Sequence, residues 1–311
     1  MNILLVNPGR RNYIVEYFLL LKKKFNLNIF LIDPDKNIPS FSIKSTKNYI
    51  CPPLTKKNKF KKFLRKFVKD KKIKIIFPVS HWELPLLSEE KYFYQRQKIK
   101  VIVSDKKVIN VCQNKINTKK ILKKNKILFP SIIKFKEIKD YLPVIKKRIL
   151  GNGSKDQQIF FRKDEISKKN NKSFFYQKYY KWKEFGLDIL NDLNGNYYHS
   201  CARKKLSLRA GDTDKAQIVF SKKFFEIAKK ISKAIKHIGI LDVDFLFNGS
   251  KILILDLNPR IGGGYPFTHE AGFNYLEQIL NWNCKKKKNI NFDKKKHIEL
   301  IFSKGISIHK N

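Results

Sequence analysis

The sequence is short of acidic residues, of paired cysteines and of long apolar runs. Its four cysteines are scattered and form no Cys-x-x-Cys pair, so the sequence indicates neither a zinc site nor a disulfide framework and favours a reducing cytoplasm. No stretch of about 20 apolar residues occurs, so no membrane span is predicted. The first residues form an apolar strand pattern, and we therefore expect no signal peptide.

The shortage of acids leaves a large positive charge. The 311 residues include 68 Lys and Arg against 26 Asp and Glu, which gives a formal net charge of +42. Such a charge suggests a nucleic-acid or anionic-membrane partner. Lys, Asn, Ile and Phe are abundant together, however, as in proteins from AT-rich genomes, and lysine runs occur on nearly every predicted helix. We favour compositional drift and expect lysines all over the surface, with no nucleic-acid or membrane partner.

Strand and helix patterns alternate in the first third of the chain. Apolar strand patterns such as Asn28–Ile32 and Ile73–Val79 are separated by segments with helical periodicity. This alternation predicts a parallel sheet with helices on its faces. The turn after the first strand lacks Gly-x-Gly-x-x-Gly, which argues against a dinucleotide site there. Its Arg10 and Arg11 could meet an anion, and the segment His81–Pro85 after another strand could line the same cleft.

Carboxylates interrupt two apolar strand patterns between Asp242 and His269. Asp244 lies in the first strand and Asp256 in the second, and Asn258 and a triple glycine follow. An acid in an apolar strand costs free energy unless something pairs with it. Two acids and an amide on adjacent strands offer the hard oxygen ligands that Mg²⁺ prefers. The hairpin therefore predicts a magnesium site.

The turn between these strands sets their register. A two-residue Asn248-Gly249 turn would pair Asp244 with Leu253 and direct the two carboxylates to opposite faces, because side chains alternate along a strand. A shared metal needs Asp244 and Asp256 on one face. We therefore predict either a three-residue loop, Asn248–Ser250, or a β-bulge.

The motif Asp-Leu-Asn-Pro-Arg, with an acid upstream and Gly-Gly-Gly-Tyr-Pro downstream, resembles the metal-binding signature of the ATP-grasp superfamily, above all its carbamoyl-phosphate-synthase-like branch. The resemblance continues in the family's order from the first strand to about Leu280. It implies an N-terminal parallel α/β pre-ATP-grasp domain followed by a two-lobed ATP-grasp domain. The boundaries we predict are 1–108 for the first domain, 109–180 for the small lobe with a phosphate lid, and 181–311 for the large lobe with the metal site.

The same resemblance implies a set of ATP-binding residues. Asn114-Lys115-Ile-Asn-Thr118 is similar to the family's Asp-Lys-x-x-Thr, and Leu142–Arg148 is similar to its Val-Val-Lys-Pro strand. Lys115 and Lys146 would then be the phosphate lysines. A Gly/Ser lid, a hinge that reads adenine through its backbone, and a ribose-binding acid would follow. These positions are Gly153 and Ser154 in the lid, Gln177, Lys178, Tyr179 and Tyr180 in the hinge, and Glu184 for the ribose.

The activity that the resemblance implies is a carboxylate–amine or carboxylate–thiol ligase. ATP would be held with Mg²⁺ or Mn²⁺ through Asp244, Asp256 and Asn258, and a small carboxylate would become an acyl-phosphate. Phosphoryl transfer needs positioning and positive charge more than a nucleophilic side chain. Arg260, Arg209 and Lys205 would be the catalytic cations. Two alternatives stay open: a basic nucleic-acid-binding protein, and a non-catalytic nucleotide-binding module. The sequence specifies neither substrate nor oligomeric state.

Overall fold

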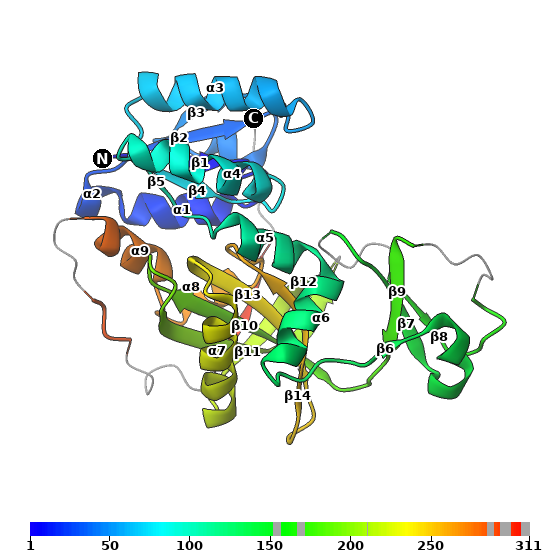
Figure 1. Cartoon of the computed structure of the whole chain (residues 1–311). Helices are drawn as coiled ribbons and strands as arrows, with labels where there is room; N and C mark the ends of the chain where they lie inside the picture. The colour runs from blue at the N-terminus through cyan, green and yellow to red at the C-terminus, as the bar shows by residue number, and fades with distance from the viewer. Residues whose placement is uncertain (152–156, 167–171, 210, 285–288, 293–299, 306–311) are drawn as a thin grey trace.

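The structure is a computed structural model that describes residues 1–151, 157–166, 172–209, 211–284, 289–292 and 300–305. In this part of the chain the strands form three sheets, of five, four and six strands. Figure 1 shows the five-stranded sheet and its helices above the six-stranded sheet, while the four-stranded sheet stands to one side. The predicted fold class, a parallel α/β domain followed by α+β lobes, is confirmed.

The five-stranded sheet is parallel and has the order β3-β2-β1-β4-β5. Its strands are β1 (Asn2–Val6), β2 (Asn28–Asp33), β3 (Lys47–Ile50), β4 (Ile75–Pro78) and β5 (Lys100–Val101). The helices between them are α1 (Asn12–Leu20), α2 (Lys22–Phe25), α3 (Lys57–Asp70) and α4 (Leu84–Arg96), with a 3-10 turn η1 (Pro39–Ser42). Core residues cover both faces, so the central strand β1 is fully buried from Ile3 to Val6.

The four-stranded sheet is antiparallel and small. Its order is β6-β9-β7-β8, and a 3-10 segment η2 (Phe135–Tyr141) packs beside it. The strands are β6 (Ile132–Ile133), β7 (Val144–Arg148), β8 (Gln158–Phe160) and β9 (Phe174–Lys178). A separate small core of apolar side chains, including Val144 and Phe160, holds this sheet together.

The six-stranded sheet is also antiparallel, with the order β14-β13-β10-β11-β12-β15. Its strands are β10 (Lys183–Asn191), β11 (Tyr197–Arg209), β12 (Asp212–Val219), β13 (Gly239–Phe247), β14 (Ile252–Asn258) and β15 (Ile301–Ser303). The remaining helices are α5 (Lys106–Gln113), α6 (Lys115–Lys124), α7 (Lys222–Ile235), α8 (Tyr265–Glu270) and α9 (Tyr275–Asn283). Helix α6 contacts β14 and α7, so it packs on the six-stranded sheet although its sequence lies in the predicted small lobe.

The two faces of the six-stranded sheet differ in polarity. On one face, apolar side chains such as Phe185, Val243 and Phe245 pack against α7, whose apolar stripe includes Phe224 and Ile231. Side chains alternate along each strand, so the residues between them point to the other face. That face carries Glu184, Asp188, Arg203, Lys205, Asp242, Asp244, Asp256 and Asn258. The fold therefore gathers charged residues from four neighbouring strands over one surface.

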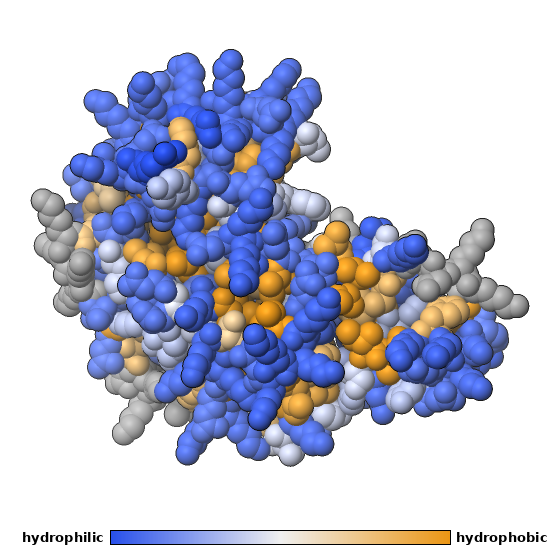
Figure 2. Space-filling view, in the orientation of Figure 1, coloured by the Kyte–Doolittle hydropathy of each residue, from blue (hydrophilic) through white to orange (hydrophobic). Residues whose placement is uncertain are grey.

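Several element boundaries differ from the sequence-based expectation. The helical spacing of apolar residues over Tyr13–Phe25 predicts one helix, but Leu21 divides this segment into α1 and α2. The apolar stripe after Ser221 predicts a helix that runs to Ile238 and is ended by Gly239, but α7 ends at Ile235, and Lys236 caps it in the left-handed conformation. No helix among the described residues has the length and apolar character to cross a bilayer. Hydrophilic residues cover most of the face shown in Figure 2, over all three sheets, and the absence of a nucleic-acid partner stays a prediction.

Candidate functional site

The loop between β13 and β14 has four residues. Phe247 pairs with Ile252, which leaves Asn248 to Lys251 in the turn. The Asn248 side-chain oxygen accepts hydrogen bonds from the backbone N–H groups of Ser250, at 3.1 Å, and Lys251, at 2.8 Å. The predicted three-residue loop is therefore wrong, because this asparagine stabilises a longer turn through its side chain.

A β-bulge then places the two carboxylates together. Phe245 pairs with Ile254, but Asp244 pairs with Asp256, so Leu255 is the extra residue in β14. Without the bulge a four-residue loop would set Asp244 opposite Leu255. The bulge that the sequence offered as the alternative is confirmed, and Asp244 and Asp256 lie side by side on the charged face.

Lysines surround the Asp256 carboxylate. Lys115 Nζ lies 2.5 Å from Asp256 Oδ1, and Lys147 and Lys119 add further positive charge. Burial alone would raise the pKa of Asp256, but these three cations outweigh it and hold that pKa below its ordinary value. Lys115 is in place because Asn114 caps α6 by accepting from two backbone N–H groups, as the family's Asp would. The arrangement keeps a carboxylate ionised in a partly buried, cationic surrounding.

Of the two adjacent lysines on β7, Lys147 is the one that faces this site. It is 5% exposed, and its surroundings include Asp256, Glu184 and Asp244; burial, the largest effect, lowers its pKa. Lys146 lies on the other side of the strand, with Nζ 4.5 Å from the centre of the Phe174 ring. The sequence resemblance picked Lys146, whereas the strand alternation favours Lys147 as the phosphate lysine.

Lys205 links the predicted ribose and metal positions. Its Nζ lies 2.5 Å from Glu184 Oε1 and 2.6 Å from Asp244 Oδ1. Burial alone would lower the pKa of Lys205, but Asp244 and Glu184 outweigh that effect and raise it. The structure thus brings Glu184 and Asp244 together around one cation.

A buried ion cluster, which sequence reasoning missed, lies beneath the charged face. Arg203 is 1% exposed; its Nη1 lies 2.7 Å from Asp188 Oδ2 and its Nη2 lies 3.0 Å from Asp242 Oδ1. A Cβ added to Gly264 would lie 2.1 Å from Arg203 Nη2, and one on Gly186 would also collide with the guanidinium. The triple glycine therefore lets the loop after β14 lie directly on this arginine. Charged residues at alternate positions of β10 and β11 were the available sequence signal.

Two guanidinium groups meet at the loop that follows β14. Arg260 Nη1 donates to the backbone carbonyl of Ile261 at 2.9 Å, and Arg11 Nη1 donates to the same carbonyl at 3.1 Å. Arg11 also donates to the carbonyl of Val79 at the end of β4. Burial, followed by the charge of Arg11, lowers the pKa of Arg260. Arg260 lies 3.9 Å from Asp242 and thus beside the predicted metal ligands.

The other predicted positions are less closely grouped. Arg209 pairs with Asp214 at 3.2 Å near the end of β11 and is half-exposed. In the hinge, the backbone N–H groups of Lys178 and Tyr179 already donate to the carbonyls of Ser131 and Pro143. The Lys178 side chain is exposed near the Tyr180 ring, and the Gln177 side chain is buried. Gly153 and Ser154 lie outside the described residues.

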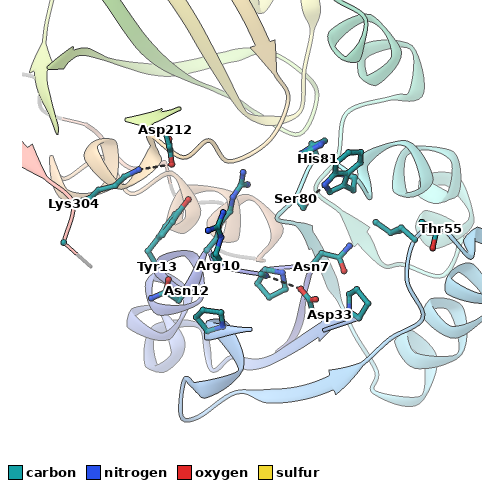
Figure 3. A pocket seen from close by; sticks show the side chains of 18 residues that line it. Asn7, Arg10, Asn12, Tyr13, Asp33, Thr55, Ser80, His81, Asp212 and Lys304 are labelled. Atoms are coloured by element: carbon teal, nitrogen blue, oxygen red, sulfur yellow. Dashed lines mark hydrogen bonds and ion pairs between the residues drawn. The ribbon is translucent and has the colours of Figure 1, made fainter. Parts of the chain in front are cut away.

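A cavity of about 1280 Å³ lies between the five-stranded sheet and the six-stranded sheet (Figure 3). The loops after β1 and β4 line it, at the point where the strand order of the parallel sheet reverses, which is where such sheets bind ligands. Arg10 and His81 line it together, as the sequence predicts, and so does the 68% exposed indole of Trp82. From the other sheet, Lys304 pairs with Asp212 at 3.2 Å. Arg11 lines this pocket and also reaches Ile261, so the pocket adjoins the charged face.

Burial shifts the titration of two groups that line this pocket. It lowers the pKa of His81 to about 4, assisted by Arg260 and Arg11, so His81 is neutral at physiological pH. It also raises the pKa of Asp33, although the backbone N–H groups of Asp35 and Gly9 act in the opposite direction. Arg10, Arg11 and Lys304 bring positive charge to the pocket, with Asp212 beside Lys304 and Asp33 at the end of β2.

The donors on the charged face fit a magnesium ion. Within the described residues, no three His, Cys, Asp or Glu side chains gather as a preformed metal cluster. Asp244 and Asp256 face each other, and Asn258 lies two residues further along the same face of β14, which gives two carboxylates and an amide oxygen. Mg²⁺ takes few protein ligands and shares the rest with phosphate oxygens and water. The donor set therefore fits Mg²⁺ that arrives with a nucleotide.

Two family models match the chain. Residues 3–102 match the model described as PylC-like, N-terminal domain, and residues 112–264 match the model described as ATP-grasp domain. The chain therefore carries an ATP-grasp domain, as the hairpin motif predicted, and is an enzyme of this class. No curated protein matches the sequence significantly.

Solved structures share this fold at low sequence identity. A biotin carboxylase from Campylobacter jejuni, complexed with β-γ-ATP, matches with a TM-score of 0.76 and 16% identity over 96% of this chain and 74% of its own. A 2-oxoglutarate carboxylase biotin carboxylase domain from Hydrogenobacter thermophilus, with MgADP and bicarbonate, matches at 0.72 and 14% over 96% and 73%. An L-amino acid ligase from Bacillus licheniformis matches at 0.68 and 14% over 91% and 74%. All three matches extend over at least nine-tenths of the present chain.

Proposed function

We propose that the enzyme is a ligase that uses ATP and Mg²⁺ to activate a small carboxylate as an acyl-phosphate for attack by an amine or a thiol. The observation that carries this proposal is the bulged register that sets Asp244 opposite Asp256, with lysines close by. The ATP-analogue, MgADP and amino-acid ligase descriptions of the similar structures support the same chemistry. The scattered free cysteines are consistent with action in the cytoplasm.

The charged face supplies the groups that such a reaction needs. Asp244, Asp256 and Asn258 would hold Mg²⁺, which supplies electrophilic assistance at the phosphate oxygens. Lys115 and Lys147 would bind phosphate oxygens, each exchanging part of its interaction with Asp256 for the nucleotide. Because these cations are already fixed by α6 and β7, little reorganisation is needed when negative charge moves during transfer.

The rest of the nucleotide would lie along the hinge and lid. Glu184 would bind the ribose hydroxyls. It would become free to do so when Lys205 leaves it and turns toward the transferred phosphoryl group. Gly153 and Ser154 keep their proposed place in the lid. For adenine, Tyr180 is the hinge residue we favour, because the N–H groups of Lys178 and Tyr179 donate within the protein; Gln177 supports the hinge from inside.

The carboxylate substrate would enter from the pocket shown in Figure 3. Arg10 provides an anchor for an anion, and the neutral His81 and the Trp82 indole provide a largely apolar wall. Arg260 and Arg11 stand between this pocket and the metal ligands, where they would stabilise the acyl-phosphate. Arg209, paired with Asp214 at the end of β11, stays a weaker placed candidate.

A product assay tests the proposal. The purified enzyme is incubated with ATP and Mg²⁺ and a panel of amino acids and small carboxylic acids, and the nucleotide products are separated. We expect ADP and phosphate, released only when a suitable carboxylate and nucleophile are present. AMP and pyrophosphate would indicate adenylation and overturn the acyl-phosphate mechanism, and failure to bind Mg-ATP would remove the ligase proposal.

A further inference from the structure

Helix α6 directs two buried lysines at strand β14. Lys115 and Lys119 are four residues apart and so lie on the same side of the helix. Lys115 pairs with the Asp256 carboxylate, whereas the hydrogen bonds of Lys119 go to backbone groups of the same strand. Its Nζ donates to the carbonyl oxygen of Ile254 at 2.9 Å and to that of Leu255 at 2.8 Å.

This pair of contacts marks the bulge. In a regular strand, the carbonyl groups of successive residues point to opposite sides, so one ammonium group cannot reach two of them at hydrogen-bond distance. Leu255 is the inserted residue, and its insertion turns both carbonyls toward α6. Lys119 therefore binds the two carbonyl groups that the bulge brings to one side.

Lys119 is buried beside an aromatic ring. The residue is 2% exposed, and its ammonium group lies 5.4 Å from the centre of the Phe129 ring. Burying a lysine costs free energy unless its donors are satisfied, so an apolar residue would be the simpler choice at a purely structural position. The cost is offset here by the two backbone carbonyls that accept from its ammonium group.

We infer that Lys119 is a positioning residue for the metal site: it holds the β-bulge at Leu255 and thereby keeps Asp256 beside Asp244. The inference rests on the proposed metal role of these carboxylates. It adds a residue that no motif assigns, one that never touches the nucleotide and acts through the backbone of β14. Removing its ammonium group leaves the bulge free to straighten, which moves Asp256 away from its partner.

Three variants separate this role from general stability. Lys119→Met keeps the apolar stem and removes the donors, Lys119→Arg keeps donors, and Lys120→Met on the exposed face of the same helix is the matched control. Two measurements are made on each folded variant. Hydrogen exchange of the β14 amides reports the bulge without any metal, and electron paramagnetic resonance measures binding of Mn²⁺ in the presence of ADP.

We expect Lys119→Met to speed exchange in β14 and to weaken Mn²⁺ binding about 10- to 100-fold, the range seen when groups that orient metal ligands are lost. Lys119→Arg should recover part of both properties, and Lys120→Met should match the wild type. If Lys119→Met does not fold, Lys119→Gln takes its place, and its shorter, uncharged amide should give an intermediate loss.

The outcomes distinguish a failure of the proposed metal-dependent function from a failure of the proposed role of Lys119. Wild-type enzyme that binds no Mn²⁺ with ADP would contradict the proposed function, and β14 exchange would still decide the role of Lys119. A Lys119 variant whose β14 exchange and Mn²⁺ binding both equal those of Lys120→Met would overturn the inference.

Discussion

The parallel and antiparallel sheets of this enzyme place their polar residues in different ways. In the parallel sheet, neighbours such as Leu4 and Leu5 are both fully buried, because helices cover both faces. In the antiparallel sheet, Val243 lies in the core while Asp242 and Asp244 on either side of it point to the charged face. Most polar groups of the first sheet that line the pocket therefore lie at strand ends and in the loops that follow, and those of the second sheet lie within the strands.

This difference decides what a substitution does. A change in a strand-end loop of the parallel sheet alters the pocket but leaves the strands intact. A change on the charged face of the antiparallel sheet disturbs ion pairs that link several strands, such as those of Lys205 and Arg203. We expect the largest effects on that face.

Replacing a metal ligand should have the largest effect. Asp256→Ala removes a charged ligand and leaves three lysines around an empty position, so we expect turnover to fall by at least about 100-fold, since metal assistance contributes several kcal/mol. ADP release is the measurement. Asp70→Ala, an exposed acid on α3, is the control. Wild-type turnover in Asp256→Ala would show that the charged face is not the reaction site.

The neighbouring lysines on β7 provide the next test. Lys147→Ala should raise the KM for ATP by about tenfold, because one charged hydrogen bond to phosphate contributes roughly 1.5–3 kcal/mol. Lys146→Ala, one residue away, should leave KM close to the wild-type value. The reverse order would restore the assignment that the sequence resemblance gave.

A substitution in the triple glycine after β14 tests how closely this loop packs on the charged face. Gly264→Ala puts a methyl group 2.1 Å from Arg203 Nη2, and such overpacking costs about 1–3 kcal/mol. We expect a melting temperature lower by roughly 3–10 °C. Gly305→Ala meets no atom within 4 Å and is the matched control. Equal melting temperatures for the two variants would mean that the loop does not rest on Arg203.

Two buried groups, one beside each sheet, make folding stability depend on pH in opposite directions. Burial raises the pKa of Glu83, beside the parallel sheet, to about 7, and lowers the pKa of His237, beside the antiparallel sheet, to about 3. The folded state keeps a proton on Glu83 that the unfolded chain loses, so the Glu83 contribution falls as pH rises from about 4.5 to 7. The folded state excludes a proton from His237, so that contribution falls as pH drops below about 6.5.

Hydrogen exchange measured across pH resolves these two slopes. Amides of β1 and β4 should lose protection toward neutral pH, and amides of β10 should lose it toward acid, each by at most about 1.4 kcal/mol per pH unit for one proton. Glu83→Gln should remove the first slope alone, and His237→Asn the second. If either variant changed the pH dependence of amide protection equally in both sheets, the assignment of one group to each sheet would be wrong.

The smallest effect is expected in the hinge. The Lys178 side chain is exposed, and its backbone N–H donates to Ser131, so Lys178→Ala should change the KM for ATP less than about twofold. Steady-state kinetics at varied ATP concentration measure this. A large rise in KM would show that the side chain itself binds the nucleotide.

Sequence patterns singled out Asp244 and Asp256, which the structure places side by side, because acids inside an apolar strand are conspicuous. The same patterns indicated Lys146 and not Lys147, because two adjacent lysines look alike until strand pairing decides which one faces inward. The sequence does not distinguish Arg203 from the other cations of β11. The structure does, because it shows Asp188 and Asp242 paired with Arg203. The turn length depended on a side-chain hydrogen bond of Asn248, which a local turn rule does not include.

The carbonyl oxygen of Ile261, which accepts from both Arg11 and Arg260, joins events in the pocket to the loop after the metal ligands. A ligand that draws Arg11 toward the pocket removes one of the two donors from this oxygen and leaves Arg260 as the other. Binding in the pocket and the position of the loop are then coupled. Thermodynamic reciprocity requires that a ligand in the pocket and a ligand at the loop change each other's affinity by the same factor. A single backbone atom would in this way make carboxylate binding and Mg-ATP binding interdependent.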